Sequence, residues 1–130
     1  MSSSLRPYSI IIFVNRKSNI SPEQFKDHWE NTHVPLLQSL AGPRFPLSHI
    51  RHYLARDSAN STYPLNLLVG KPQDINFDAF AVVTFASEEA FRDFIPTMSL
   101  PEVAEDEDRF TDREKMRAVV LGYRNETGGT

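Results

Sequence analysis

The chain has 130 residues, a formal net charge of −3, 40% hydrophobic residues and no cysteine. This length and composition fit one globular domain. The missing cysteines exclude disulfides, iron–sulfur clusters, thiolate zinc sites and a cysteine nucleophile. An acidic balance without a block of Lys or Arg argues against nucleic acid and anionic membranes as partners.

The N-terminal segment 1–8 is rich in serine and lacks the apolar centre of a signal peptide. No apolar run in the sequence reaches transmembrane length. We therefore expect a cytoplasmic protein made of one domain over residues 1–130. Its ordered core is expected at 7–123 and is followed by a polar tail at 124–130.

The first two predicted elements are a strand and a helix. Tyr8–Val14 is apolar and β-branched on both faces, which is typical of a strand covered on both sides. The helix is predicted to begin at Ser21, because Ser21 and Gln24 have the spacing of a capping box and Pro22 suits the first helical position. Pro35 should bend or interrupt this helix, since it removes one amide donor.

The rest of the chain repeats this alternation. Ser87 is expected to cap a second helix, and Pro96 is expected to break it. Ser99 and Glu102 offer another capping box, so a further helical segment is predicted to run to Phe110. Alternating or continuously apolar segments predict three more strands, at Leu47–Ala55, Ala79–Phe85 and Arg117–Tyr123.

The elements follow the order β-α-β-β-α-β, which is that of a ferredoxin-like α+β fold with one antiparallel sheet and its helices on one face. The other face of the sheet is also apolar, so we expect two copies to pair face to face as a dimeric α+β barrel. The segment 56–78 is long for a loop between strands. Its middle, Leu65–Val69, could form an extra edge strand, and the whole segment is expected to be either a lid or a dimer-contact arm.

Histidines are the first candidates for chemistry, and two of the four lie on the first helix. His33 is on the apolar side of that helix, four residues after Trp29. This position fits either a histidine satisfied inside the core or a reactive one. His28 lies five residues before His33, so the two should not share a face of a regular helix, and His28 is expected to be partly exposed.

The second predicted strand carries a polar triple. Because side chains alternate along a strand, His49, Arg51 and Tyr53 share one face. If this face looks toward the helices, the triple and His33 would line one pocket and would need partners or a ligand. The alternative is a solvated strand face on which Arg51 pairs with an acidic neighbour.

Three further residues are candidates for binding a substrate. Trp29 and Phe80 could form walls for a flat substrate, and Asp112 could bring a charge to the mouth of the pocket or sit in a surface salt bridge. The acidic stretch 102–108 is interpreted as a solvated helix face. The sequence has no metal-site spacing, no phosphate-binding glycine loop and no GxSxG motif, so we expect no metal and no cofactor.

Several of these residues belong to a longer pattern. The segments Ser21–Phe25, His28–Asn31 and His33–Leu36 resemble the helix signature of the EthD-domain family. A narrower resemblance is to the small fungal decarboxylases of anthraquinone pathways, which act on atrochrysone carboxylic acid. It is carried by Phe45–His49, Arg51, Tyr53, the Tyr63–Pro64 step, Asp108–Phe110, Asp112 and Met116.

The resemblance implies a cofactor-independent decarboxylase of an aromatic polyketide β-keto acid in fungal secondary metabolism, acting as a homodimer. In this interpretation His33 or His49 polarises the ketone and returns the proton. Arg51 would hold the carboxylate or the enolate, and Tyr53 would donate to a phenolic oxygen. The residues expected to hold the substrate are His28, Trp29, Tyr63, Phe80 and Asp112.

Two alternatives remain open at this point. One is a cofactor-free dehydratase, cyclase, isomerase or monooxygenase acting on a polycyclic polyketide with the same His, Arg and Tyr side chains. The other is a dimer that binds aromatic ligands without turning them over.

Overall fold

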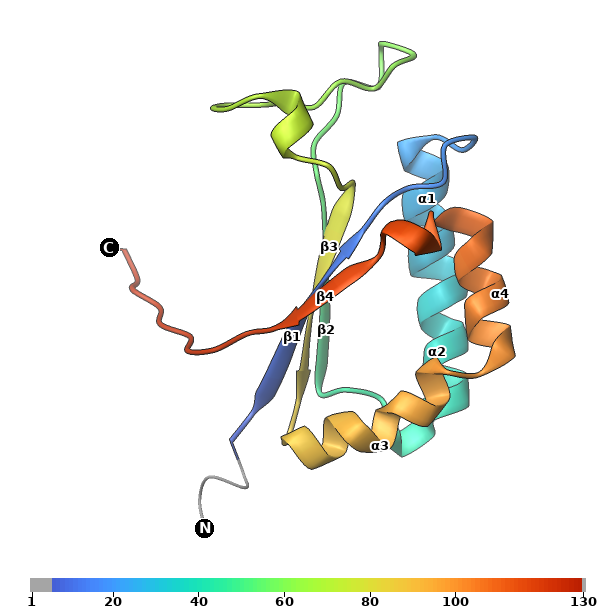
Figure 1. The fold of residues 1–130 in the computed structure, drawn as a ribbon, viewed down its shortest axis with the longest axis vertical. Helices are drawn as coiled ribbons and strands as arrows, with labels where there is room; N and C mark the ends of the chain where they lie inside the picture. The colour runs from blue at the N-terminus through green and yellow to red at the C-terminus, as the bar shows by residue number, and fades with distance from the viewer. Residues whose placement is uncertain (1–5, 130) are drawn as a thin grey trace.

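The computed structural model describes residues 6–129, so the expectations for Met1–Leu5 and for Thr130 lie outside the described residues. Four strands form one antiparallel sheet in the order β2-β3-β1-β4. Figure 1 shows that the helices lie on one side of this sheet. The strands are β1 (Tyr8–Val14), β2 (Ser48–Tyr53), β3 (Ala79–Phe85) and β4 (Arg117–Val120), and the helices are α1 (Pro22–His28), α2 (Val34–Ala41), α3 (Glu88–Met98) and α4 (Pro101–Phe110).

The predicted ferredoxin-like α+β fold is confirmed by this topology. The alternation along β3 explains how the sheet carries a core. Ala79, Ala81, Val83 and Phe85 face the helices and are at most 2% exposed, whereas the residues between them face the other way. Within the described residues, no helix is both long and apolar enough to cross a membrane.

The core between sheet and helices is mainly aromatic. Phe25 and Trp29 from the first helix meet Phe110 from α4, with ring centroids 5.7–6.0 Å apart. Phe85 and Phe94 extend this contact toward α3. All five rings are at most 4% exposed. Burying side chains of this size stabilises a domain strongly and fixes the positions of the elements that carry them.

The first helix is interrupted by a π-helical turn at Trp29–His33, which joins α1 to α2. The amide of Val34 donates to the carbonyl of Trp29, five residues earlier. The interruption comes directly before Pro35, which has no amide to donate and so cannot continue the regular ladder. The predicted start of this helix is also confirmed, because Ser21 and Gln24 form the capping box in both directions.

Three local predictions are wrong. Pro96 does not break α3, because the helix omits one hydrogen bond and continues to Met98. Ser99 does not cap α4; its hydroxyl donates to the carbonyl of Ile95, and α4 begins after Leu100 with Pro101 at its first position. The last strand ends at Val120 instead of Tyr123.

The segment between β2 and β3 contains no extra edge strand. Its one β contact is an isolated bridge between Arg56 and Leu65. The guanidinium of Arg56 donates to the carbonyl of Tyr63 and pairs with Asp78 at 3.0 Å, so side-chain contacts hold the segment. The segment lies beyond one end of the sheet, opposite α3 (Figure 1).

Candidate active site

A cavity of about 50 Å³ lies between the sheet and the helices. One water needs at least about 10–15 Å³ of such volume, so the space holds roughly four waters or a group of a few heavy atoms. Its walls are mostly apolar and come from the π-helical turn, from α2, α3 and α4, and from β1, β2 and β3. Three titratable residues are among those that line it, namely His33, His49 and Glu107.

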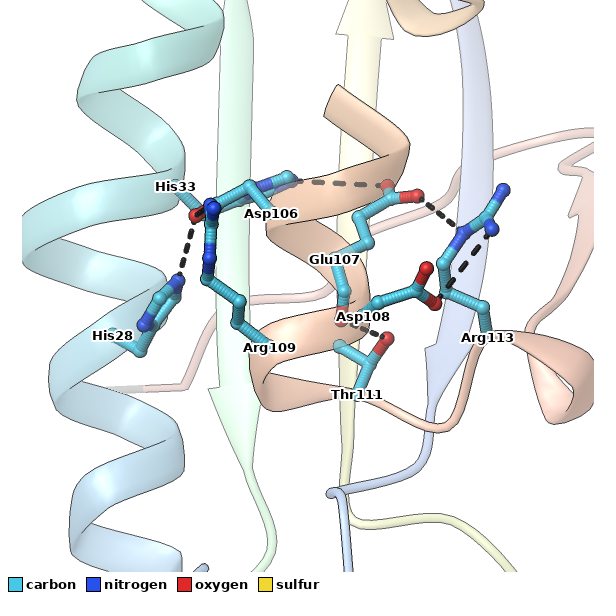
Figure 2. A network of polar contacts seen from close by, with 8 residues as sticks. All are labelled: His28, His33, Asp106, Glu107, Asp108, Arg109, Thr111 and Arg113. Carbon is cyan, nitrogen blue, oxygen red and sulfur yellow. Dashed lines mark hydrogen bonds and ion pairs between the residues drawn. The ribbon is translucent and has the colours of Figure 1, made fainter. Parts of the chain in front are cut away.

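His33 is oriented by a buried carboxylate from α4. Its Nδ1 lies 2.8 Å from Oδ2 of Asp106, and the two side chains are 5% and 2% exposed. The same carboxylate binds His28, whose Nε2 lies 3.0 Å from Oδ1. Figure 2 shows both histidines on the first helix reaching toward Asp106.

The π-helical turn explains why both histidines reach one carboxylate. In a regular helix, residues five apart point in different directions, and the sequence therefore predicted separate faces. A turn closed by a hydrogen bond over five residues brings such residues onto the same side. The prediction that His28 and His33 do not share a face is therefore wrong, and the interruption before Pro35 is the reason.

The tautomer of His33 follows from its partner. An ionised carboxylate can only accept, so Nδ1 of His33 carries the proton that Asp106 accepts. Burial lowers the pKa of His33, although Asp106 opposes the shift, so the ring is neutral at pH 7. Its Nε2 then has a free lone pair, and this atom lies 3.8 Å from Oε2 of Glu107. His33 therefore offers a base to the cavity.

Glu107 lies beside that base. Burial raises the pKa of Glu107, and the ion pair with Arg113 at 3.2 Å opposes the shift. Figure 2 shows Glu107 between His33 and Arg113. Its carboxyl group can therefore hold a proton beside the cavity, and its partner Arg113 has a side chain that is 43% exposed.

His49 has the opposite tautomer. Nη1 of Arg51 lies 2.8 Å from Nδ1 of His49. Arginine has no acceptor, so the guanidinium donates and Nδ1 must be unprotonated. Burial, followed by the charge of Arg51, lowers the pKa of His49 to about 4. The ring is neutral at pH 7, and its proton is on Nε2, so His49 offers a donor.

Arg51 and Tyr53 are occupied by a carboxylate that the sequence did not single out. Arg51 binds Glu30 in a two-pronged pair, with Nε to Oε2 at 2.6 Å and Nη2 to Oε1 at 3.0 Å. The hydroxyl of Tyr53 donates to Oε2 of Glu30 at 2.6 Å. Both expected catalytic groups thus contact Glu30, and neither lines the cavity.

The expected substrate-binding residues are scattered. Trp29 lines the cavity, whereas His28 binds Asp106 without lining it. Phe80 is on the opposite face of the sheet, stacked on His52. The two others lie elsewhere, with the ring of Tyr63 under the guanidinium of Arg16 and Asp112 paired with Lys115. The structure therefore does not bring Phe80, Tyr63 or Asp112 to this cavity.

Asp106 and Glu107 come from the acidic stretch that was interpreted as a solvated helix face. That interpretation is wrong for Asp106, which is 2% exposed. A signal was available in the spacing of Val103, Asp106 and Phe110, which lie three and four residues apart and so share one helical face. Two apolar neighbours at these positions indicate that Asp106 is buried.

Within residues 6–129, no group of three or more histidine or acidic side chains is arranged to hold a metal ion. The elements and the cavity define a class: an α+β protein with one antiparallel sheet, helices on one face, and a small buried site with two histidines between the layers. The sequence model of the EthD domain matches residues 17–114, so the chain belongs to the EthD domain family.

Solved structures agree with this fold. An EthD family protein from Bacillus halodurans is 12% identical, with a TM-score of 0.55, over 92% of this chain and 100% of that one. An EthD-like protein from Ralstonia eutropha is 14% identical, with a TM-score of 0.54, over 88% and 87%. At3g17210 from Arabidopsis thaliana is 17% identical, with a TM-score of 0.54, over 92% and 98%. No curated protein sequence matches the chain.

Proposed function

We propose that the protein is a cofactor-independent enzyme that forms an enolate in the cavity between His33 and His49. The observation that carries this proposal is the pair of opposite tautomers. Nε2 of His33 can accept a proton, and Nε2 of His49 can donate a hydrogen bond. A base and a donor facing one small space are what proton abstraction next to a carbonyl requires.

The reaction needs no other reagent. His33 takes a proton from the carbon next to the carbonyl, and the electrons of that C–H bond form a carbon–carbon double bond. The carbonyl π electrons move to oxygen, where the N–H of His49 stabilises the developing charge. His33 then returns the proton at another carbon, which gives isomerisation. Alternatively, a hydroxyl group on the next carbon leaves as water, which gives dehydration.

The cavity favours an uncharged carbonyl group. Its walls are mostly apolar, and no cation within the described chain is free to bind a carboxylate there. Arg51 is held by Glu30, and Arg113 is held by Glu107 and Asp108. A substrate with three fused rings is larger than this cavity, which holds about four waters. A polycyclic polyketide would therefore enter by one keto-bearing edge, with the flexible Met98 and Met116 in the wall adapting to it.

A second candidate is decarboxylation of a β-keto acid, the reaction implied by the narrower resemblance. The raised pKa of Glu107 favours it. After CO₂ leaves, the electrons of the broken C–C bond enter the substrate's own ketone, and protonated Glu107 would return a proton to carbon. The donor on His49 would serve the enolate oxygen as in the first candidate.

Two substrates separate the candidates. Exchange of the protons of pentane-2,4-dione in D₂O, followed by NMR, tests proton abstraction on a molecule that suits the cavity. Loss of 44 mass units, the mass of CO₂, from atrochrysone carboxylic acid tests decarboxylation. Each requires a no-enzyme control, because both reactions also proceed spontaneously.

The variants are His33→Gln and His49→Gln, with His52→Gln as the matched control on the outer face of β2. We expect the first two to slow exchange by about 10²–10⁴-fold and the control to have no effect. If the wild-type protein accelerates neither reaction, the proposal fails, and binding of such ligands without turnover would then favour the non-catalytic alternative.

A further inference from the structure

Glu30 lies in the π-helical turn and contacts two side chains of β2. It accepts from Nε and Nη2 of Arg51 at 2.6 and 3.0 Å and from the hydroxyl of Tyr53 at 2.6 Å. The remaining arm of the guanidinium, Nη1, donates to Nδ1 of His49 at 2.8 Å and to the carbonyl of His49 at 3.0 Å. Glu30 and His49 are therefore joined through one rigid, planar group.

The planarity of the guanidinium makes this connection directional. Arg51 presents its donors in a fixed fork, and a two-pronged pair with a carboxylate sets the orientation of the whole group. When Nε and Nη2 are bound to Glu30, Nη1 is directed at His49. The Arg51 side chain is 18% exposed and that of Glu30 is 30% exposed, so these contacts are partly shielded from water.

We propose that Glu30 is a positioning residue that fixes the tautomer of His49 through Arg51. The inference rests on the proposed function, in which His49 must present an N–H to the cavity. Without Glu30, the guanidinium loses two of its three anchored nitrogens and is free to turn toward solvent. Nδ1 of His49 then loses its donor, and the ring can move its proton from Nε2 to Nδ1.

The negative charge of Glu30 balances the positive charge of Arg51. The hydrogen bond from Arg51 lowers the pKa of Glu30, so the carboxylate stays ionised across the physiological range. Burial, together with the bond to Glu30, raises the pKa of Tyr53, which therefore remains a donor. Hydrogen bonds join Tyr53, Glu30, Arg51 and His49 in that order, and the donor hydrogen of each of these bonds therefore has one fixed position. The only tautomer of His49 compatible with that arrangement has its proton on Nε2.

The test is Glu30→Gln, because glutamine keeps the shape but has one acceptor and cannot bind both arms of Arg51. The primary measurement is the ¹⁵N spectrum of His49, assigned with His49→Gln, which distinguishes protonated from unprotonated ring nitrogens without any substrate. Arg51→Met removes the donor directly. Glu88→Gln is the matched control, because Glu88 pairs with Arg92 at 2.6 Å on α3 and both side chains are more than half exposed.

We expect wild type and Glu88→Gln to show one tautomer, with the proton on Nε2. Glu30→Gln and Arg51→Met should show a mixture with the Nδ1–H form. For the exchange of pentane-2,4-dione, kcat should fall about 10- to 100-fold with KM within about threefold, as for residues that orient functional histidines in metal enzymes.

A single Nε2–H tautomer in folded Glu30→Gln would overturn the inference, even if the enzyme is active. A shifted tautomer in a protein without any turnover would support the inference and count against the proposed function. If Glu30→Gln does not fold, Arg51→Met decides the question by the same spectrum.

Discussion

The carboxylate of Asp106 offers the sharpest test of the site, through the substitution Asp106→Asn. The side chain is 2% exposed and accepts from His28 at 3.0 Å, from His33 at 2.8 Å and from the largely exposed Arg109 at 3.3 Å. Asparagine has nearly the same shape but only one acceptor oxygen, and its amide group donates instead. One histidine must therefore either lose its hydrogen bond or turn its unprotonated nitrogen toward the new amide.

The size of the effect follows from these contacts. A hydrogen bond to a charged group contributes about 1.5–3 kcal/mol, and the substitution removes one of the two histidine bonds to the carboxylate and makes the other neutral. We expect the free energy of unfolding to fall by about 2–3 kcal/mol, which is roughly 6–12 °C in Tm for a chain of this length. If His33 adopts the other tautomer, its Nε2 can no longer act as a base, and kcat should fall about 10²–10⁴-fold.

The pH dependence identifies the carboxylate as the cause. Burial would raise the pKa of Asp106, but hydrogen bonds from His33 and His28 lower it below its ordinary value of 3.8. A group with a lowered pKa in the folded state stabilises the protein above its unfolded pKa and loses this contribution as pH falls through the folded pKa. The difference between wild type and Asp106→Asn should therefore be full at pH 7 and shrink below about pH 4.

Urea unfolding at pH 7, 5 and 3 measures this difference. Asp108→Asn is the matched control, because Asp108 lies on the same helix with its side chain 63% exposed and pairs with Arg113 only at 3.7 Å. The control should change stability by less than about 0.5 kcal/mol. Equal stability of wild type and Asp106→Asn at pH 7, or a difference that does not change with pH, would refute the reasoning.

Three further predictions concern the reaction and the core. Burial lowers the pKa of His33, so the rate of proton exchange should rise with pH through a value below 6.5 and then level off. Decarboxylation with Glu107 as the acid should instead slow as pH rises, because Glu107 loses its proton. Either activity should survive EDTA, and loss that one divalent metal restores would contradict this. Phe110→Ala should lower the free energy of unfolding by about 3–5 kcal/mol in urea, because the 2% exposed ring packs on Phe25, Trp29 and His33.

Local sequence patterns predicted the strand bounds and the helix start that depend on neighbouring residues. The bounds of β1 and β3 match the predicted strands because those segments are predominantly apolar and have clear ends. The capping box at Ser21 was also predictable, since all its bonds lie within four residues. Pro96 was harder to place, because a proline near the end of a helix removes only one hydrogen bond.

The site was predictable only in part, because its geometry depends on contacts between distant segments. Alternation placed His49 and Arg51 on one face of the strand but did not decide whether that face looks toward the helices, and the pairing of Arg51 with an acidic neighbour was part of one of the two open interpretations. No local pattern identifies that neighbour as Glu30, which is 21 residues away. The sharing of Asp106 by two histidines depends on the π-helical turn, and sequence periodicity assumes that such turns are absent.

The outer face of the sheet leads to the last prediction, which is that two copies pair there. Ile50, Val82, Ile11 and Val119 are aligned in register across all four strands. The helices leave this face uncovered (Figure 1), and Ile50 and Val119 are 51% and 56% exposed. An apolar row across a whole sheet is costly in water, so we propose that a second copy covers it.

Light scattering on a sizing column should therefore give twice the chain mass at micromolar concentration. Val82→Lys places a charge at the centre of the row and should produce a monomer. Leu68→Lys tests the segment between β2 and β3, because Leu68 belongs to this segment, is 92% exposed and is not part of a sheet strand. If Leu68→Lys also weakens the dimer, the segment is a dimer arm. A wild-type monomer would refute the pairing, since the apolar row would then be stable in water without a partner.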